Sequence, residues 1–202
     1  KLIHCSSSEV YGVYEGVMYE DILNQTPILQ MNDYAMSKRV NEMQVYNSRS
    51  QHGTQTVMVR FFNTYGPGEW YHPFRSVNCL FTYNLLHGKP IIVFKGHSRT
   101  STYIYDSVRT LANIADNFID GEVYNIASDQ EHTIENLAEI LVKYTKADSS
   151  LVDYRDHNEI LTTKHKHVDA SKSVRDLDHK NTVSLEEGVW ETVQWMKEHY
   201  RL

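Results

Sequence analysis

The chain has 202 residues and a formal net charge of −6, with 41% hydrophobic and 23% charged residues. This balance is ordinary for a globular protein that buries one sizeable core. The negative charge and the scattered lysines and arginines argue against a nucleic-acid role, and no apolar run is long enough to span a membrane.

Hydrophobic periodicity and turn residues predict strands that alternate with helices, which indicates an α/β protein with a largely parallel sheet. In chain order, the predicted elements are a strand at 2–5, a loop at 12–31, a helix at 33–52, a strand at 56–62, a helix at 74–86, strands at 91–95 and 100–105, a helix at 106–118, a strand at 122–126, a helix at 134–146, short strands at 151–154 and 167–169, and a final helix from 185 onward. A structureless loop as long as 12–31 is usually functional.

Several helix ends carry capping signals. Asp33, Asp106 and Thr133 each stand at the start of a predicted helix, and Gly53 follows the end of the first one. Ser184 with Glu187 three residues later forms a capping box that predicts the start of the last helix.

The two cysteines, Cys5 and Cys79, lie far apart and predict a reducing compartment, so we expect a cytoplasmic protein without a disulfide framework. No signal peptide is recognisable in the sequence. The chain starts with lysine rather than methionine, which is typical of an internal start. Loss of a targeting segment therefore stays an open alternative.

Tyr34 and Lys38 are four residues apart on a predicted helix and therefore lie one turn from each other on the same side. A free phenol is a poor base at neutral pH, and a cation held one turn away favours the phenolate. Such a pair can take a proton from a substrate hydroxyl and return it. By itself, the spacing is equally compatible with a solvated surface pair.

The sequence around this pair has a specific order. Residues 3–12 read Ile-His-Cys-Ser-Ser-Ser-Glu-Val-Tyr-Gly, and residues 59–68 read Val-Arg-Phe-Phe-Asn-Thr-Tyr-Gly-Pro-Gly. An apolar strand ending in serines, a Tyr-x-x-x-Lys helix and a second apolar strand ending in Asn-x-Tyr-Gly-Pro resemble the extended short-chain dehydrogenase/reductases, in their nucleotide-sugar epimerase, dehydratase and decarboxylase branch. The resemblance runs through nearly the whole chain but lacks the family's N-terminal nucleotide-binding half.

The resemblance implies the second half of a Rossmann-type parallel sheet plus a smaller α/β substrate-binding lobe. It implies that residues 1–73 belong to the NAD-binding lobe and 74–202 mainly to the sugar-nucleotide-binding lobe, with 106–126 returning to the first. None of the nine glycines forms a Gly-x-Gly-x-x-Gly or Gly-x-x-Gly-x-x-Gly fingerprint for the NAD pyrophosphate. Because a parallel sheet cut at its centre exposes an apolar edge, we expect that an N-terminal segment is omitted from this sequence.

The resemblance also assigns roles to residues. It implies that Tyr34 is the acid/base, that Lys38 also holds the nicotinamide ribose, and that Ser7 shares the substrate hydroxyl with Tyr34. It places Asn63 and Tyr65 against substrate and nicotinamide. The remaining residues expected beside NAD are Cys5, Ser6 and Phe61.

Ser8 and Glu9 occupy the positions that separate the reaction classes in this family. Its 4,6-dehydratases carry Asp-Glu there, whereas its UDP-glucuronate decarboxylases carry Ser-Glu and its 4-epimerases vary. Ser8 cannot serve as a strong acid, so the pair argues against dehydration and leaves decarboxylation and epimerisation open. Without the resemblance, these residues would be a polar strand end bonded to the backbone.

Further basic residues are candidates for binding the diphosphate of a UDP- or dTDP-sugar. Arg99 matches an arginine of the family that grips the diphosphate, which suits its planar, bidentate donors, although the residues after it depart from the family's Arg-Asp-Phe pattern. Arg75 and Lys95 are further candidates for the diphosphate or for a sugar carboxylate, and a solvated surface role competes for each. The resemblance implies that Lys164 lies near the diphosphate. His165 and His167 share a face of a strand, but no third ligand follows at a suitable spacing, so we predict no metal site.

The sequence therefore predicts an NAD-dependent nucleotide-sugar enzyme, with C4 epimerisation of a UDP-hexuronate or UDP-hexose preferred. The alternatives are a UDP-glucuronate decarboxylase, an enzyme like the dTDP-glucose 4,6-dehydratases, or a non-catalytic remnant that binds a sugar nucleotide. A homodimer through the helix over 34–52 is expected from the resemblance.

Overall fold

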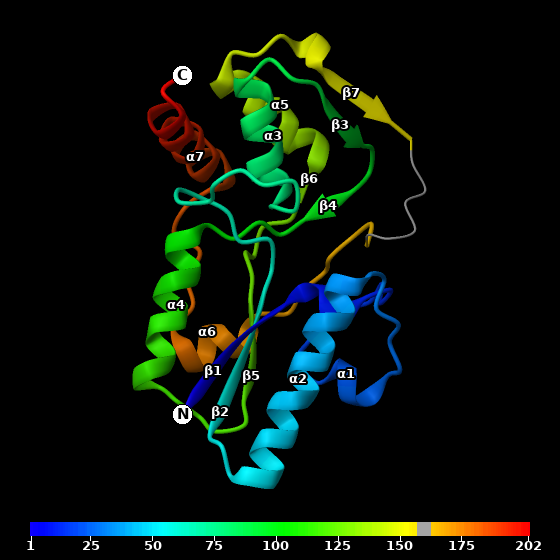
Figure 1. Ribbon diagram of the computed structural model, residues 1–202, viewed down its shortest axis with the longest axis vertical. Coiled ribbons are helices and arrows are strands. Elements are labelled where there is room, and N and C mark those ends of the chain that lie inside the picture. Colours follow the sequence, from blue (N-terminus) through cyan, green and yellow to red (C-terminus); the bar gives the residue numbers. More distant parts are fainter. Residues whose placement is uncertain (157–162) are drawn as a thin grey trace.

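The computed structural model describes residues 1–156 and 163–202. Its elements gather at the two ends of the long axis, with a three-stranded sheet and its helices at one end and a helix-rich group at the other (Figure 1). The predicted α/β class with a parallel sheet is confirmed. Among the described residues, no helix combines the length and the apolar character needed to cross a bilayer.

The sheet consists of β1 (Leu2–Ser7), β2 (Thr56–Phe61) and β5 (Val123–Ile126), all parallel and in the order β1-β2-β5. Residues Thr56 to Arg60 of β2 are all buried, which is typical of a central parallel strand covered on both faces. Since parallel strands end at a common edge, Ser7 of β1 stands opposite Phe61 of β2.

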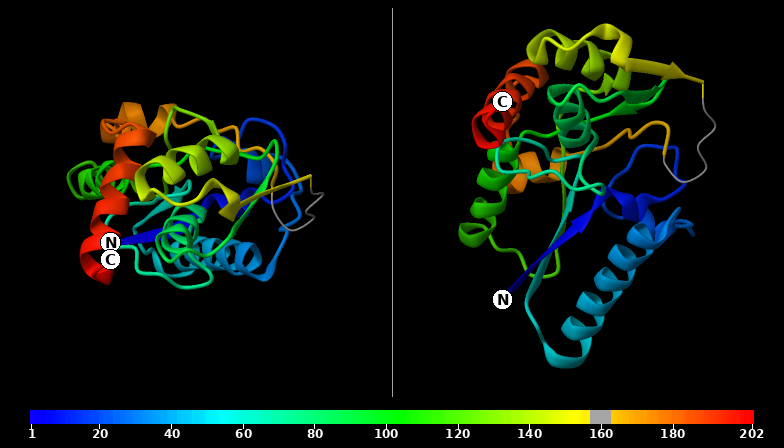
Figure 2. Two further views of the ribbon diagram at one scale, coloured as in Figure 1. Left: turned by 90° about the horizontal axis from the view of Figure 1, so that it is seen from above. Right: turned by 45° about the horizontal axis from the view of Figure 1, so that its top comes forward.

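Helices cover both faces of this sheet. Alternate residues of β2 point to opposite sides, so Met58 packs with Val45 of α2 (Asp33–His52). On the other face, Val57 and Val59 pack with α4 (Ile104–Asp116) and α6 (Ser171–Leu177). The views in Figures 1 and 2 agree on this layering.

The second group of elements is built around its own core. It contains α3 (Val77–Leu86), α5 (Ile134–Thr145), α7 (Leu185–Tyr200), the parallel pair β3 (Ile91–Phe94) and β7 (Val152–Arg155), the antiparallel pair β4 (Ser98–Arg99) and β6 (His132–Thr133), and the short helix η2 (Ser149–Leu151). Leu137, Leu141 and Val193 are completely buried where α5 and α7 pack together. The domain boundaries proposed from the sequence stay predictions.

Several helix ends agree with the capping signals. The Thr133 side chain accepts a hydrogen bond from Asn136 N, and Ser184 accepts one from Glu187 N. Gly53 ends α2 in the left-handed conformation that glycine adopts without strain. At the start of α2, however, the cap is Asn32, which accepts from Ala35 N at 2.9 Å, and Asp33 is the first helical residue.

The predicted strand at 100–105 is wrong, apart from a single bridge between Tyr65 and Tyr103. The helix α4 begins at Ile104, so Asp106 lies inside its first turn and is not its cap. Asp106 is buried and instead accepts hydrogen bonds from the backbone and hydroxyl of Thr182 and from Val183 N. It therefore anchors the segment that leads into α7.

Three smaller differences follow from local contacts. The predicted helix at 74–86 begins only at Val77, because Ser76 caps it. The region predicted as a loop over 12–31 is preceded by the short helix η1 (Ser8–Tyr11) and contains the one-turn helix α1 (Ile22–Gln25). The predicted strand at 167–169 is reduced to a bridge between Met18 and Val168, and α6 was not predicted.

Candidate active site

The carboxyl end of β1 holds a run of three buried serines, Ser6, Ser7 and Ser8. The strand turns here into η1, in which Glu9 N donates to the Ser7 hydroxyl at 3.2 Å. The hydroxyls of Ser6 and Ser8 are bound by side chains from other parts of the chain. Open parallel sheets place their ligand sites at this edge, so the serines stand where the sequence predicted a site.

Tyr34 and Lys38 lie beside the same strand end, because α2 packs along β1 and η1. The Lys38 ammonium donates to the Cys5 carbonyl at 3.1 Å and lies 5.7 Å from the centre of the Tyr34 ring. The Tyr34 side chain is half exposed, with 54% relative exposure. The structure thus places the predicted tyrosine-lysine pair beside the strand end that carries the predicted serines.

Glu9 forms an ion pair with Lys166, a contact between residues 157 apart in sequence. Lys166 is almost fully buried and also donates to the Ser8 hydroxyl at 3.1 Å. Burial raises the pKa of Glu9, but the neighbouring charge and hydrogen bond of Lys166 outweigh it and hold the pKa below its ordinary value. Burial lowers the pKa of Lys166, and Glu9 offsets this only in part.

The second strand end adds Phe61 and Asn63, both half-buried. Asn63 adopts a left-handed conformation with φ of 43°, and its carbonyl accepts a hydrogen bond from Thr102 N at 3.3 Å. Tyr65 then pairs with Tyr103 in a short parallel bridge. The chain therefore leaves the sheet at Asn63 and crosses directly into the second group of elements.

A buried polar network connects the elements that carry the candidate site residues. The Arg60 guanidinium donates to both oxygens of Glu42, at 2.8 and 3.0 Å, and to the Tyr11 hydroxyl at 2.9 Å. Ser6 donates to Glu42 at 2.7 Å, and the Tyr11 hydroxyl donates to Asn125 at 2.7 Å. We call Ser6, Tyr11, Glu42, Arg60 and Asn125 the Arg60 network; it ties α2 to all three strands of the sheet and to η1.

The ionisation of this network follows from its contacts. Burial alone would raise the pKa of Glu42, but the hydrogen bonds and charge of Arg60 hold it below its ordinary value. Burial raises the pKa of the Tyr11 hydroxyl to about 12, so this group stays protonated and donates. This network was not predicted from the sequence, although an arginine inside an otherwise apolar strand indicates that a buried anion must pair with it.

The predicted basic residues divide between the site and its surroundings. Arg99 is close enough to act on the charges of both Glu9 and Lys166, and its side chain donates to the carbonyls of Ser98 and Lys164. The Lys164 side chain is on the exposed part of this segment and reaches over Gly96. Lys95 pairs with Asp156 at 3.6 Å on the surface, and Arg75 is exposed just before α3.

His165 and His167 meet a third group that the sequence spacing did not reveal. Glu131, which directly precedes β6, lies 3.1 Å from His167 Nδ1 and 4.0 Å from His165 Nδ1. No third ligand lies at a suitable spacing close by in the chain, so the prediction of no metal site followed from local spacing, whereas the fold supplies a third group from a distant turn.

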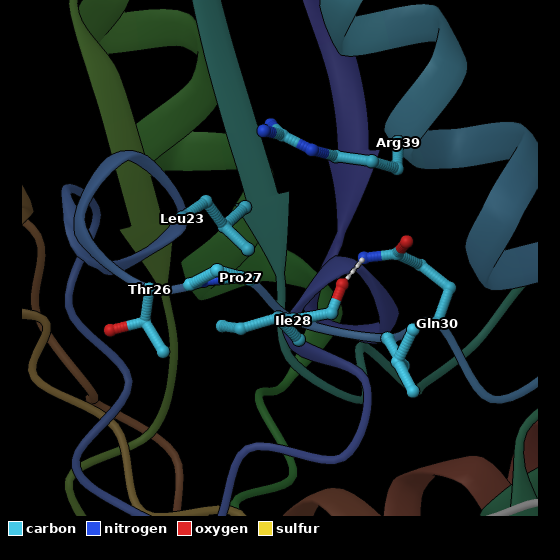
Figure 3. A pocket seen from close by; sticks show the side chains of 7 residues that line it. Leu23, Thr26, Pro27, Ile28, Gln30 and Arg39 are labelled. Atoms are coloured by element: carbon cyan, nitrogen blue, oxygen red, sulfur yellow. Dashed lines mark hydrogen bonds between the residues drawn. The ribbon is translucent and has the colours of Figure 1, made fainter.

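A separate cavity of about 300 Å³ lies between α2 and the segment that follows α1. Its lining residues are Leu23, Thr26, Pro27, Ile28, Leu29, Gln30 and Arg39 (Figure 3). The Gln30 amide donates to the Ile28 carbonyl at 3.2 Å at its edge. None of the predicted catalytic, cofactor-binding or substrate-binding residues lines this cavity, so it does not coincide with the serine and tyrosine cluster.

Comparison with known proteins connects this arrangement to a family. Residues 1–127 match the model of the NAD dependent epimerase/dehydratase family. The chain is 30% identical to a UDP-N-acetyl-alpha-D-glucosaminuronate decarboxylase of Bacillus cytotoxicus, over 98% of this chain and 64% of the relative. It is 27% identical to UDP-glucuronate 4-epimerase 1 of Arabidopsis thaliana, over 98% of this chain and 49% of that protein.

Solved structures agree with these matches. The UDP-glucuronic acid 4-epimerase from Bacillus cereus, in complex with UDP-glucuronic acid and NAD, superposes with a TM-score of 0.85 at 26% identity, over 98% of this chain and 62% of that one. The epimerase Mth375 from Methanothermobacter thermautotrophicus gives a TM-score of 0.88 at 25% identity, over 98% and 60%. The chain thus spans less than two thirds of each of these relatives.

Proposed function

Because this chain belongs to the NAD-dependent epimerase/dehydratase family, we propose that it forms the nicotinamide and sugar side of a nucleotide-sugar 4-epimerase. The substrate would be a UDP-hexuronate or UDP-hexose. The observation that carries the proposal is the placement of Tyr34 and Lys38 at the serine-rich end of β1, with Lys38 bonded to the Cys5 carbonyl. Relatives with this fold include 4-epimerases that bind UDP-glucuronic acid and NAD.

The residues at the strand end fit the nicotinamide side of NAD. A lysine ammonium has three donor hydrogens, and the described contacts of Lys38 use one of them, for the Cys5 carbonyl. Its other donors would bind hydroxyls of the nicotinamide ribose. Cys5, Ser6, Phe61 and Asn63 complete this side of the proposed cofactor site.

In the proposed reaction, bound NAD would supply the group that accepts the hydride from C4 of the sugar and from which the hydride returns. Tyr34 takes the proton of the C4 hydroxyl as the 4-keto sugar forms, and gives it back after the ketone has turned over. Lys38 places its ammonium beside the Tyr34 ring in this exchange, and Ser7 is proposed to orient the same hydroxyl. Arg99, Lys164 and Arg75 are the proposed contacts of the nucleotide diphosphate.

The state of Ser8 and Glu9 supports epimerisation over dehydration. The Ser8 hydroxyl is held by Lys166, and the Glu9 carboxylate is held ionised by the same ammonium. A carboxylate kept ionised in this way is a poor general acid, whereas dehydration needs an acid beside C5 and C6. In an epimerase, Glu9 needs only to shape the pocket.

A decarboxylase is the second candidate, because Lys166 and Arg99 place two cations beside Glu9. Such a site would attract a sugar carboxylate, and a relative at 30% identity is a decarboxylase. In that reaction, the 4-ketone acidifies the neighbouring carbon and carbon dioxide leaves. Both reactions return the hydride, so neither accumulates NADH.

Incubation with NAD and UDP-glucuronate in heavy water separates the two candidates. We expect UDP-galacturonate without deuterium at C5, because epimerisation at C4 forms no carbanion there. We also expect Glu9→Gln to keep a substantial fraction of turnover. Nuclear magnetic resonance of the product measures both. Release of carbon dioxide with a UDP-pentose product would show that the protein is a decarboxylase and not an epimerase. Loss of all turnover in a Glu9→Gln protein that remains folded would place Glu9 in the chemistry.

We also propose a homodimer through α2. Met36, Val40 and Met43 recur at helical spacing on this helix and are 51%, 47% and 53% exposed, which leaves an apolar stripe opposite the buried face. A second copy of the helix would cover this stripe. We expect Val40→Glu to convert a dimer into a monomer in sedimentation equilibrium, because the charge would be buried at the interface.

The matched control for this experiment is Val108→Glu, which changes a similarly exposed valine on α4. This variant should remain dimeric. A wild-type protein that sediments as a monomer, or a dimer that survives Val40→Glu, would remove α2 as the interface.

A further inference from the structure

A second cluster of chemically active side chains lies outside the catalytic residues. Glu131, His165 and His167 each offer one ligand atom, and these atoms all lie within 4.8 Å of one another. Glu131 approaches from the turn before β6, while the two histidines belong to the segment that carries Lys166 between them. Lys166 is buried and faces Ser8 and Glu9, whereas both histidines are exposed, as expected for alternating residues of an extended chain.

The ligand atoms of Glu131 and His167 have a spacing that suits a shared ion. Oε2 of Glu131 lies 3.1 Å from Nδ1 of His167. In a tetrahedral zinc site with ligands at about 2.0–2.1 Å, neighbouring ligand atoms stand roughly 3.3 Å apart, so this pair already has the required spacing.

A buried serine orients the cluster. The Ser98 hydroxyl donates to Oε1 of Glu131 and lies 2.9 Å from Nδ1 of His165. A hydroxyl that donates to the carboxylate is left to accept from the imidazole N–H, which assigns the proton of His165 to Nδ1. The lone pair of His165 is then on Nε2, and the serine fixes this ring by a hydrogen bond, as outer groups do for the ligands of metal sites.

We propose that Glu131, His165 and His167 bind a divalent transition-metal ion of borderline softness, such as Zn²⁺ or Co²⁺. Two imidazoles and one carboxylate are a donor set that such ions prefer. The fourth position would hold water. Glu131 and His167 also line a cavity of about 170 Å³ together with Lys166, Thr100 and Asp129, so solvent can reach the ion.

The exposure of the three ligands indicates an exchangeable site rather than a structural one. Their side chains are 35%, 46% and 50% exposed for Glu131, His165 and His167 respectively. Removing any one of them therefore leaves the fold intact while it removes a ligand. The proposal rests on this geometry alone and does not depend on the sugar or on NAD.

Titration with Co²⁺, followed by its visible absorption, tests the site in the absence of nucleotide and sugar. We expect one ion per chain with a tetrahedral spectrum, displaced by Zn²⁺. His165→Ala, His167→Ala and Glu131→Gln should each weaken the affinity by about tenfold or more. His52→Ala, which removes an exposed histidine at the end of α2, should leave the affinity unchanged.

Thermal unfolding of each metal-free variant confirms that the fold is retained. Equal Co²⁺ affinity for the wild type and the three ligand variants would overturn the proposal. No binding below millimolar Co²⁺ would overturn it as well, and would leave Glu131 and the histidines as a surface ion-pair cluster. Neither outcome affects the epimerase proposal, which is tested by product analysis.

Discussion

Replacing Tyr34 with phenylalanine is expected to lower kcat for epimerisation by about 10²–10⁴-fold, the usual contribution of a positioned acid/base. The substitution removes only the hydroxyl from a ring that is 54% exposed, so the free energy of unfolding should stay unchanged. Binding of NAD and UDP should also persist, because Lys38 keeps its bond to the Cys5 carbonyl. Steady-state turnover of the UDP-sugar, together with UDP affinity by calorimetry, measures both effects.

Tyr105→Phe is the matched control for this experiment. Tyr105 is 63% exposed on α4 and lies outside the strand ends that form the site, so its variant should turn over at the wild-type rate. If Tyr34→Phe kept wild-type turnover, Tyr34 would not be the acid/base. If neither protein turned over any nucleotide sugar although both bound UDP, the non-catalytic alternative would hold.

The largest effect on stability is expected at Glu42. Glu42→Gln leaves the Arg60 guanidinium buried without its anion, and breaking a buried ion pair on one side costs about 3–5 kcal/mol. Urea unfolding of the wild type and the variant gives this difference in the free energy of unfolding. Replacing Glu42 and Arg60 together with methionine should cost less than the single change, since no buried charge then remains.

Arg39→Ala provides the control, because Arg39 pairs with the same carboxylate at 3.2 Å from the more exposed side. Its loss should cost no more than about 1 kcal/mol, as for other partly exposed ion pairs. A cost below 1 kcal/mol for Glu42→Gln as well would show that the Arg60 network does not stabilise the fold.

The same carboxylate predicts a direction for the pH dependence of stability. The pKa of Glu42 is lower in the folded protein than in the unfolded chain, chiefly because Arg60 outweighs the effect of burial. As the pH falls, the Glu42 carboxylate therefore binds a proton more readily in the unfolded chain than in the folded protein. Its contribution to the free energy of unfolding is complete above its unfolded pKa and is lost on acidification through its folded pKa. In Glu42→Gln, this part of the acid destabilisation should be missing.

Local pattern was sufficient for much of the fold and for the position of the predicted site. The helical spacing of Tyr34 and Lys38 and the serines after an apolar strand are short-range signals, and parallel strands bring their ends to one edge by geometry alone. The caps at Thr133 and Ser184 were visible because a capping residue lies within three positions of its partner. The family match covers 1–127 and therefore spans the serines and the tyrosine-lysine pair.

The long-range partners could not be predicted in this way. Lys166 is far from Glu9 in sequence, and nothing near either residue specifies the other. The alternation over 100–105 predicted a strand, but a helix starts at Ile104. Asp106 in the first turn of this helix accepts hydrogen bonds from residues 182–183, and such a distant contact cannot be seen in the local pattern. Glu131 likewise reaches His165 and His167 only through the fold.

The Arg60 network has a consequence for the way in which the protein assembles. Its members come from β1, η1, α2, β2 and β5, so it closes only when segments more than a hundred residues apart have met. A partly formed state that buries Arg60 before all its partners have arrived would contain a guanidinium group without its hydrogen-bond acceptors. The free energy of such a state is high in a medium of low polarity. Intermediates in which α2 docks loosely on the sheet are therefore disfavoured. The alignment of Tyr34 and Lys38 with the strand end thus arises in the same cooperative step as the sheet itself, and a chain that has folded at all has folded with its proposed catalytic helix in register.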